Sequence, residues 1–572
     1  MVKAILNCTN LSVEYKNGVN AVRGVSFNID PSECLALVGE SGCGKTSIAH
    51  AALGLLPSTA SIGGSIRING NEVIGASTAV LQQLRGRTIG FVSQDPFESC
   101  NPLDKVKLHI SEAWHAHRLK IPNNKIPDLL SELGIKNSNI KMKQFPHQWS
   151  GGMLQRATIA AAIAHKPSLV IADEPTSALD ADISDTTLTL LKQAGTAILL
   201  ISHDIDVVKR HADRIAVIYA GKIVEINDVK KVLSTPKHPY TIALLRAIPQ
   251  SGRGLPHPLP GTPPDLSARN KGCSFAPRCP YVKSSCFRFT PVLRHGVACL
   301  VMGKHGFKRD HNSIIGLHKH ILYESGGSPS EPESKKRQIP SIYKEKPVAE
   351  VHHITKIYGK GTRTVNAVVD ASLRIYKGEI VGICGSSGCG KSTFLRILST
   401  IEVPDDGTVH MDSQYINNDR RGGSAHKLLR RGYVMPIFQD PVRSLDQQWP
   451  IWRTITEPLM ARQFLSKKVR RKVASKELGN IGLGHIDINA RPYELSLGQC
   501  QRISIIRALI SNPALITADE PTSALDASVS ATILHLLADA AAKGTAIVIV
   551  SHDIAVLNAL CHRVLTMRDG VL

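Results

Sequence analysis

An internal duplication constrains this chain more than any other feature of its 572 residues. The segment GESGCGKT at residues 39–46 recurs as GSSGCGKS at residues 385–392, and ADEPTSALDA at 172–181 recurs at 518–527. An offset of 346 residues separates Lys45 from Lys391 and Ser150 from Ser496. Because motifs repeated in one order at one spacing mark a repeated structural unit, we expect two copies of one domain.

The duplication divides the chain into four parts. We expect the first copy to span residues 1–250 and the second residues 347–572. Residues 251–302 carry four cysteines among prolines, which predicts a compact insert with many loops, whereas residues 303–346 are rich in Lys, His, Ser, Pro and Glu, which is typical of a flexible linker. A linker of about 45 residues spans about 35–40 Å, enough for the copies to dock face to face.

The composition is that of a globular protein, with 42% hydrophobic residues and a formal net charge of +22. No window of 18 apolar residues occurs, so we expect no membrane-spanning helix. Asn7, Asn10 and Glu14 interrupt the amino terminus, which argues against a secretory signal and for a cytosolic protein. The positive charge suits work beside nucleotides, nucleic acids or anionic lipids and does not choose among them.

Each copy contains a glycine-rich loop of the form G-x-x-x-x-G-K-[ST]. Apolar runs at residues 34–38 and 380–384 predict a buried strand before each loop, and a helical pattern follows it. In this context backbone N–H groups point at phosphate oxygens, the lysine neutralises the β and γ phosphates, and the hydroxyl ligates Mg²⁺. The expected ATP-binding residues are Gly39, Ser41, Gly42, Gly44, Lys45 and Thr46, and Gly385, Ser387, Gly388, Gly390, Lys391 and Ser392, with Thr46 and Ser392 as Mg²⁺ ligands.

Two adjacent carboxylates end a second apolar run in each copy. LVIADE ends at Asp173 and Glu174, and LITADE ends at Asp519 and Glu520. We expect the two aspartates to hold the Mg²⁺ shell. The two glutamates are placed to orient and deprotonate the water that attacks in an in-line phosphoryl transfer.

Two further segments, WSGGMLQR at 149–156 and LSLGQCQR at 495–502, stand at predicted helix starts. With the glycine-rich loops and the carboxylates, they make the chain resemble two ATP-binding cassette (ABC) ATPase subunits fused in tandem. The resemblance covers nearly every residue outside the insert and the linker. It implies an α/β fold with two P-loop nucleotide-binding domains, each with a RecA-like core, an antiparallel β part and a helical subdomain.

The resemblance also implies roles for residues outside the loops. The segments at 149–156 and 495–502 match the family's signature motif. The copies would close head to tail over two ATPs, with each signature facing the γ phosphate held by the other copy, and would reopen on hydrolysis. The residues assigned in this way are Ser150, Gly151, Gly152, Ser496, Gly498 and Gln499 in the signatures, Gln94 and Gln439 in the Q-loops, Asp180 and Asp526 in the D-loops, His203 and His552 as switch histidines, and Tyr15 and Tyr358 stacked on adenine. For the two tyrosines a packing role stays open.

The second signature departs from the family pattern, because Leu497 replaces the first glycine. A bulky side chain at this place crowds the phosphate and strains any backbone conformation that only glycine tolerates. We therefore expect two unequal sites. The site that uses Lys45, Glu174 and Ser496 should hydrolyse ATP more slowly than the site that uses Lys391, Glu520 and Ser150.

Residues after the first copy indicate what the cassettes power. HPYTIALLRAIP at 238–249 is followed by PGTPPDL and CSFAPRCPYVKSSC, a succession that resembles the carboxyl-terminal region of oligopeptide, dipeptide and nickel importer ATPases. The resemblance implies an ATPase subunit of a bacterial peptide importer at the cytoplasmic face of the inner membrane. Its implied partners are two transmembrane permease subunits and an extracytoplasmic substrate-binding protein. The residues do not specify the solute, whether peptide, nickel or glutathione-like.

The alternative is a soluble tandem-cassette protein that acts on ribosomes. That class uses a long charged helical arm between its cassettes, whereas Pro329, Pro332 and Pro340 break helices in residues 303–346. The linker and the cysteine insert therefore favour the importer, and we expect no nucleic acid partner.

The insert carries Cys273, Cys279, Cys286 and Cys299 at spacings C-x5-C-x6-C-x12-C. Structural zinc sites usually offer C-x2–4-C pairs, so the spacing disfavours zinc. Four thiolates also suit a [4Fe-4S] cluster, which some importers of this family carry at these positions. A cluster, a zinc ion and unligated thiols all stay open, with the cluster as the first expectation.

Overall fold

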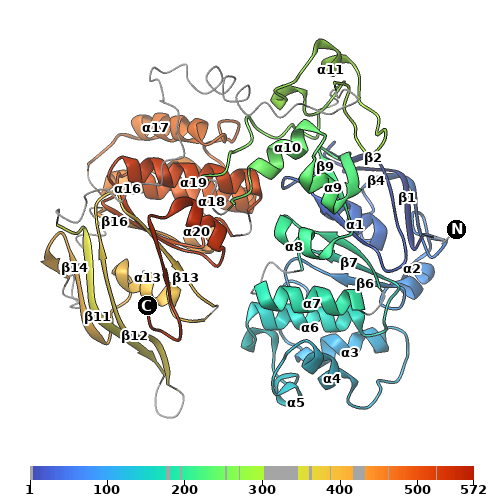
Figure 1. Ribbon diagram of the computed structural model, residues 1–572, viewed down its shortest axis with the longest axis horizontal. Coiled ribbons are helices and arrows are strands. Elements are labelled where there is room, and N and C mark those ends of the chain that lie inside the picture. The colour runs from blue at the N-terminus through green and yellow to red at the C-terminus, as the bar shows by residue number, and fades with distance from the viewer. Residues whose placement is uncertain are drawn as a thin grey trace. The chain divides into compact units, whose positions relative to one another are not determined.

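The computed structural model describes residues 4–175, 181–193, 196–250, 254–268, 271–301, 346–359, 364–386, 388–416, 432–461, 463–523 and 525–572. They form two compact units, each with its own sheets and core (Figure 1). One unit contains the described residues up to Leu245 and residues 260–301, and the other contains residues 246–250, 254–259 and those from 346 onward. All of the expected linker at 303–346 except Lys346 lies outside the described residues, and the domain boundaries drawn from the sequence stay a prediction.

A six-stranded sheet in the order β10-β9-β3-β8-β7-β6 forms the centre of the first unit. Its strands are β3 (Cys34–Val38), β6 (Ile89–Val92), β7 (Leu169–Asp173), β8 (Ala197–Ile201), β9 (Arg214–Tyr219) and β10 (Lys222–Asp228). All neighbours are parallel except β10, which pairs antiparallel with β9. Every residue of β3, β7 and β8 is buried, because parallel strands are covered on both faces. Helices of this part are α1 (Lys45–Leu53), α7 (Ala181–Gln193), α8 (Ile205–His211) and α9 (Val229–Ser234).

An antiparallel sheet in the order β2-β1-β4-β5 lies beside α1. Its strands are β1 (Leu6–Glu14), β2 (Asn20–Ile29), β4 (Ser61–Ile68) and β5 (Asn71–Glu72), and the short helix α2 (Thr78–Leu84) follows. Residues along β2 alternate between buried and exposed over much of its length, as expected of a sheet with one face on the core. One hydrophobic cluster joins this sheet, α1 and the inner face of the central sheet.

A helical subdomain completes the first cassette. It contains α3 (Val106–His115), α4 (Lys125–Glu132), α5 (Ser138–Lys141), a 3₁₀ turn η1 (Pro146–Gln148) and α6 (Gly151–Ile163). Helices α3 and α4 pack on α6 (Figure 1) around the buried Trp114 and Trp149. The signature segment at the start of α6 is thus carried by a subdomain with its own apolar core.

The chain continues from the first cassette into a loop-rich extension that packs back on it. This part contains α10 (Pro239–Arg246), the 3₁₀ turn η2 (Ala276–Arg278) and α11 (Ser284–Arg288). The ring of Phe275 packs on Tyr219 of β9 and Tyr240 of α10, with ring centroids 5.2 and 5.5 Å apart. Ala298 donates a backbone hydrogen bond to Val224 of β10 at 2.8 Å. The extension is therefore anchored to the edge of the central sheet.

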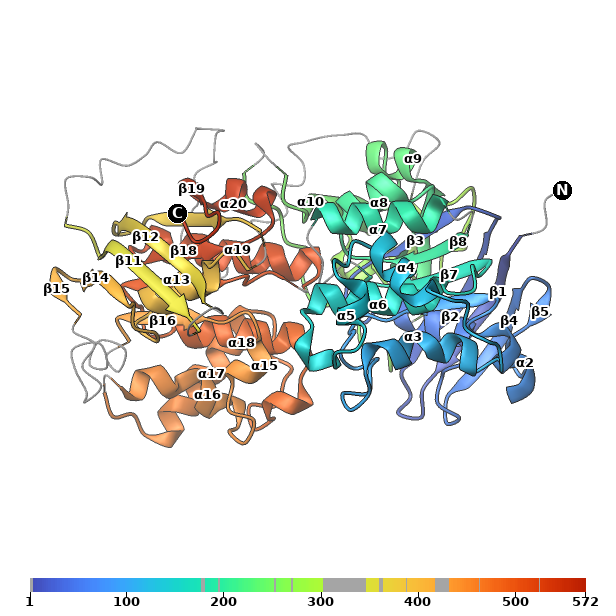
Figure 2. The ribbon, with the colours of Figure 1, turned by 90° about the horizontal axis from the view of Figure 1, so that it is seen from below.

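The second unit repeats the plan. Its parallel sheet has the order β16-β17-β18-β13-β19 and its antiparallel sheet the order β12-β11-β14-β15. In its helical subdomain α16 packs on α17 and α18 (Figure 2). The strands are β11 (Ala349–Tyr358), β12 (Val365–Ile375), β13 (Ile380–Cys384), β14 (Asp406–Met411), β15 (Gln414–Tyr415), β16 (Val434–Ile437), β17 (Leu515–Asp519), β18 (Ala546–Val550) and β19 (Arg563–Thr566). The helices are α13 (Lys391–Leu398), α15 (Pro441–Ser444), α16 (Ile451–Met460), α17 (Lys467–Asn480), η5 (Pro492–Glu494), α18 (Leu497–Leu509), α19 (Ala527–Ala542) and α20 (Ile554–Leu560).

The architecture confirms the predicted fold class, because each unit combines a parallel core sheet, an antiparallel sheet and a helical subdomain. Among the described helices, none is both long enough and apolar enough to cross a bilayer.

Candidate active sites

The glycine-rich loop of the first copy joins β3 to α1, as predicted. Gly44 at the start of α1 has φ of 104°, and a Cβ added there would lie 2.2 Å from the carbonyl oxygen of Ala21, so glycine is required. The buried Lys45 ammonium donates to the carbonyl oxygens of Gly39 at 2.8 Å and Glu40 at 3.0 Å. The loop therefore curls around the lysine at a helix N-terminus, which is a favourable place for a phosphate group.

The second loop has the same geometry between β13 and α13. Gly390 has φ of 107°, and a Cβ there would lie 1.8 Å from the carbonyl oxygen of Ala367. Lys391 donates to the carbonyl oxygens of Gly385 and Ser386, both at 2.8 Å. Of the residues predicted in this loop, Ser387 lies outside the described residues.

The two predicted Mg²⁺ ligands of each copy are in contact. The Thr46 hydroxyl hydrogen-bonds to Asp173, and the Ser392 hydroxyl to Asp519. Burial raises the pKa of both aspartates above the ordinary value, and these hydrogen bonds oppose the rise only in part. The oxygen atoms of each pair suit a hard cation such as Mg²⁺.

Both carboxylate oxygens of Glu174 are contacted by side chains that follow other strands of the central sheet. Gln94, after β6, donates from Nε2 to Oε2 at 3.1 Å, and Nδ1 of His203, after β8, lies 3.1 Å from Oε1. Burial favours the neutral carboxyl, but the hydrogen bond and charge of His203 outweigh it and lower the pKa of Glu174. The structure thus brings together three residues that the sequence predicts as parts of one site.

The second copy repeats this triad. Gln439 Nε2 lies 3.3 Å from Oε2 of Glu520, and His552 Nδ1 lies 3.3 Å from Oε1. The pKa of Glu520 is also lowered, because contact with His552 outweighs the effect of burial. Two candidate hydrolytic centres of matching geometry therefore exist in the chain.

Glu174 and Glu520 both adopt a backbone conformation that the sequence does not predict. Glu174 has φ of 47° and Glu520 has φ of 46°, in the left-handed region that residues with a Cβ rarely adopt. Their amides donate to the carbonyl oxygens of Ile201 at 2.9 Å and Val550 at 3.0 Å, which ties each glutamate to the neighbouring strand. Such backbone strain clusters at functional sites.

Each signature serine caps a helix. Ser150 precedes α6, and its Oγ accepts the N–H of Met153 at 3.3 Å. Ser496 precedes α18, where its Oγ accepts the N–H of Gln499 at 3.3 Å and Gln499 accepts the N–H of Ser496 at 2.8 Å. Gly151, Gly152 and Gly498 lie in the first turns of these helices. Each signature therefore presents a helix N-terminus, and contact with the opposite copy stays a prediction.

The backbone-strain argument for Leu497 is wrong. Leu497 is the first residue of α18 and is absent from the residues with positive φ, so its backbone is helical and suits any amino acid. Its side chain is 41% exposed. The steric part of the expectation, that a bulky side chain at this helix start crowds the phosphate of the opposite site, stays a prediction.

The two predicted adenine-stacking tyrosines have different surroundings. The Tyr15 hydroxyl lies 3.0 Å from Oγ of Ser47 in α1, next to the glycine-rich loop. Tyr358 ends β11, is 38% exposed and donates its hydroxyl to Glu402. Tyr15 also packs on the core, so both roles considered for it fit its position.

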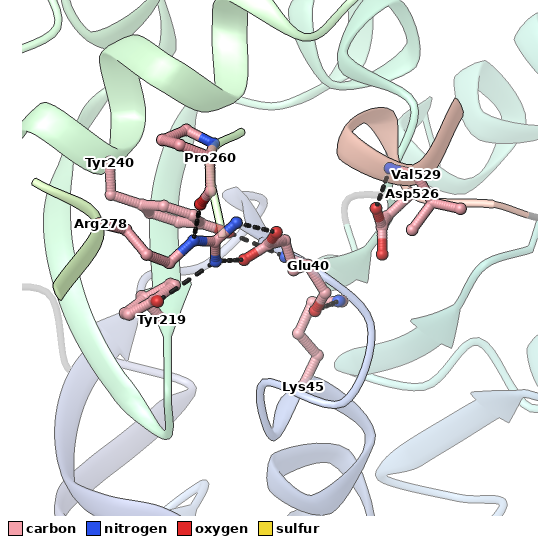
Figure 3. A network of polar contacts seen from close by, with 8 residues as sticks. All are labelled: Glu40, Lys45, Tyr219, Tyr240, Pro260, Arg278, Asp526 and Val529. Atoms are coloured by element: carbon pink, nitrogen blue, oxygen red, sulfur yellow. Dashed lines mark hydrogen bonds and ion pairs between the residues drawn. The ribbon is translucent and has the colours of Figure 1, made fainter. Parts of the chain in front are cut away.

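Of the two predicted D-loop residues, Asp180 lies outside the described residues. Asp526 immediately precedes α19, and its side chain accepts the N–H of Val529 at 3.0 Å (Figure 3). This contact is a helix cap, which needs no role in ATP binding.

All four cysteines of the extension are free of disulfides, and the other three act electrostatically on Cys279. The amide of Cys273 donates to the carbonyl oxygen of Cys286 at 2.7 Å. Burial raises the pKa of the Cys279 thiol to about 12 and also raises that of Cys273. In the parts of the chain that the structure describes, no group of three or more His, Cys, Asp or Glu side chains is arranged to hold a metal ion.

Sequence reasoning missed the residues that join the extension to the first glycine-rich loop. Arg278 forms a buried ion pair with Glu40, and Tyr240 accepts the Glu40 amide. The one available signal was the difference between Glu40 and Ser386 at equivalent positions of otherwise similar loops. Nothing in the sequence pointed to Arg278.

Comparison with known proteins gives two family matches. The family "ABC transporter" matches residues 22–177 and 368–523, and "Oligopeptide/dipeptide transporter, C-terminal region" matches residues 224–286. The first covers most of both cassettes. The second begins in β10 and runs through α9, α10 and η2 to Cys286.

Named relatives align along almost the whole chain. The oligopeptide transport ATP-binding protein OppD of Mycobacterium tuberculosis is 36% identical over 99% of this chain and 94% of its own length. The glutathione import ATP-binding protein GsiA of Pectobacterium atrosepticum is 32% identical over 99% of this chain and 85% of its own length. The peptidoglycan transport ATP-binding protein YejF of Agrobacterium fabrum is 31% identical, with coverages of 99% and 91%. With two matched cassettes and relatives that align along almost its whole length, this chain belongs to the ATP-binding subunits of the ABC transporter family.

Proposed function

We propose that the protein hydrolyses ATP to power a bacterial importer of peptides or peptide-like solutes. The observation that carries the proposal is the oligopeptide-type extension packed on a cassette whose Gln94, Glu174 and His203 form one contact network. Relatives named for oligopeptide, glutathione and peptidoglycan transport support this substrate range. Peptide bonds and free carboxylates are chemical features that these solutes share.

The residues of each copy divide the work of hydrolysis. Lys45 and the amides at the start of α1 bind the β and γ phosphates, while Thr46 and Asp173 hold Mg²⁺. When bound, Mg²⁺ neutralises phosphate charge. Glu174, ionised because of its lowered pKa, accepts the proton of the attacking water. His203 and Gln94 hold its two oxygens in place.

The second copy uses Lys391, Ser392, Asp519 and Glu520 in the same roles, with His552 and Gln439 as the orienting pair. The signature of the other copy completes each ATP-binding site. ATP binding therefore closes the cassettes, and hydrolysis reopens them. This cycle drives two permease subunits at the cytoplasmic face of the inner membrane, and a binding protein outside the membrane delivers the solute.

Copurification tests this function. The tagged protein is isolated from its native cell in mild detergent, and the associated proteins are identified by mass spectrometry. Two multi-span permeases and peptide-stimulated ATP hydrolysis in the reconstituted complex are the expected result. Ribosomal proteins without permeases would overturn the importer and leave the ATPase chemistry standing. The variant pair Glu174→Gln and Glu520→Gln serves as the hydrolysis-deficient control.

We propose further that Cys273, Cys279, Cys286 and Cys299 together bind one [4Fe-4S] cluster. The proximity of four thiols and the absence of disulfides among them support this, and soft thiolates suit iron–sulfur ligation. The side chains as described do not form a finished metal cage, so ligation requires them to rotate or shift.

Anaerobic purification followed by iron, sulfide and zinc assays tests the cluster. About four irons and four sulfides per chain, lost in Cys279→Ser, are expected. Stoichiometric zinc, or no metal with four titratable thiols, would overturn the proposal.

A further inference from the structure

A buried ion pair links the extension to the glycine-rich loop of the first ATP site. Nη1 of Arg278 lies 2.7 Å from Oε2 of Glu40, and Nη2 lies 3.0 Å from Oε1, so the contact is bidentate (Figure 3). The side chains are only 4% and 5% exposed. The two residues are 238 positions apart in the sequence, one in η2 and the other in the loop itself.

The remaining contacts of Arg278 tie it both to the extension and to β9. Its Nε donates to the carbonyl oxygen of Pro260 at 2.7 Å, and Nη1 also donates to the Tyr219 hydroxyl at 3.2 Å. The Tyr240 hydroxyl accepts the backbone N–H of Glu40 at 2.9 Å. Glu40 is thus fixed by two groups of the extension, its side chain by Arg278 and its backbone by Tyr240, while Tyr219 of β9 holds Arg278 (Figure 3).

The position of Glu40 makes this anchoring relevant to ATP. Its carbonyl oxygen accepts the Lys45 ammonium, so any shift of Glu40 moves the partner of the phosphate-binding lysine. The loop is rich in glycine, which gives it little stiffness of its own. A carboxylate next to the phosphate site also repels ATP unless a cation neutralises it.

The second copy shows that the lysine geometry itself does not require a carboxylate. Ser386 replaces Glu40 and is exposed, yet Lys391 makes the same two carbonyl contacts as Lys45. The carboxylate therefore serves a purpose specific to the first site, and its contacts identify that purpose as attachment to the extension.

We propose that Arg278 is a positioning residue for the first ATP site, where it neutralises Glu40 and fixes the glycine-rich loop in a form ready to bind phosphate. The extension thereby sets the ATP affinity of one cassette and not of the other. The inference rests on ATP binding at the loop, as proposed above.

The test measures binding of Mg²⁺ with the non-hydrolysable analogue AMP-PNP to the full chain by calorimetry. Lys391→Ala disables the second site, so that binding reports the first. In that background Arg278→Met leaves the Glu40 carboxylate unpaired, and we expect Kd to rise about tenfold. Adding Glu40→Ser, which copies the second loop, removes the repulsion and returns Kd to within about threefold of the parent.

The matched control places Arg278→Met in a Lys45→Ala background, where only the second site binds. Its Kd is expected to stay unchanged. An equal loss in both backgrounds, or no rescue by Glu40→Ser, means that Arg278 only supports folding and overturns the proposal. If the Lys391→Ala parent binds no analogue, the proposal that the first site binds ATP is wrong, and the inference that rests on it is wrong as well.

Arg278→Lys covers the event that Arg278→Met does not fold. A lysine keeps the charge and loses the bidentate contact, so a smaller rise in Kd of about threefold is expected at the first site alone. An unchanged Kd at the first site in Arg278→Lys would overturn the proposal.

Discussion

His203 and Glu174 face each other across the carboxyl ends of two neighbouring strands, with Nδ1 of the histidine 3.1 Å from Oε1 of the glutamate. Burial alone would lower the pKa of His203, but the hydrogen bond and charge of Glu174 raise it. Each partner therefore favours the charged form of the other. In the proposed mechanism this pair keeps Glu174, the general base of the first site, ionised.

The pair makes a pH-dependent contribution to stability. Because the pKa of His203 is raised in the folded protein, the stabilisation is complete below the ordinary histidine value and is lost as the pH rises through the raised one. Because the pKa of Glu174 is lowered in the folded protein, the stabilisation from its carboxylate is complete above the ordinary glutamate pKa. This stabilisation is lost as the pH falls through the lowered pKa. We expect His203→Asn to lower Tm by roughly 2–4 °C at pH 6 and by less at pH 9. Scanning calorimetry of both proteins checks this, and a difference that is constant with pH would contradict it.

The two hydrolytic centres are expected to be unequal. Leu497 places an exposed side chain at the helix start that faces the ATP held by Lys45 and Glu174 in the proposed closed form. Crowding there slows turnover, so Glu520→Gln removes most of the ATPase activity and Glu174→Gln removes less, with a difference of about threefold or more in the remaining rate.

Leu497→Gly is the matched variant for the unequal sites. It restores the family pattern without strain, since the backbone is helical at this position. We expect it to raise the turnover of the Glu520→Gln protein. Equal losses in the two glutamine variants, measured by phosphate release, would rule out the asymmetry.

Much of each active site follows from local sequence. A buried apolar strand, a glycine-rich turn and a helix start fix where Lys45 and Thr46 lie, because few backbone paths join such elements. Ser150 and Ser496 occupy helix caps that their residue type favours. The meeting of Gln94, Glu174 and His203 follows once the strands that carry them are neighbours in a parallel sheet.

Contacts set by tertiary packing could not be predicted in the same way. The left-handed backbone of Glu174 and Glu520 has no residue-type signature, since glutamate rarely adopts it. The pairing of Glu40 with Arg278 joins segments 238 positions apart, and only the packing of Tyr219, Tyr240 and Phe275 brings them together. The prediction of backbone strain at Leu497 is wrong because the first turn of a helix accepts any side chain.

His238 in the extension gives a second pH prediction. It is buried and its Nδ1 accepts the Tyr240 amide at 3.0 Å, and burial lowers its pKa to about 3. The unfolded chain takes up a proton near pH 6.5 and the folded chain does not, so stability is complete above pH 6.5 and declines below it. At pH 5 the loss is about 2 kcal/mol.

His238→Asn keeps an acceptor for the Tyr240 amide and removes the titrating ring. We expect its unfolding free energy to change less than that of the parent between pH 7.5 and pH 5, as measured by urea unfolding followed through fluorescence. Parallel pH profiles for the two proteins would show that His238 is not the responsible group.

The two tyrosines offer a test of adenine recognition. Loss of a stacked ring costs about 1–3 kcal/mol, so Tyr15→Leu is expected to weaken ATP binding at the first site about tenfold while tripolyphosphate, which lacks a base, binds as before. Tyr15→Phe keeps the ring and loses only the contact with Ser47, and should therefore bind ATP almost normally. Tyr358→Leu and Tyr358→Phe form the corresponding pair for the second site. Calorimetry with both ligands separates the alternatives, because only contact with adenine distinguishes ATP from tripolyphosphate. If Tyr15→Leu weakens the binding of both ligands equally, the tyrosine supports the loop by packing and does not contact adenine.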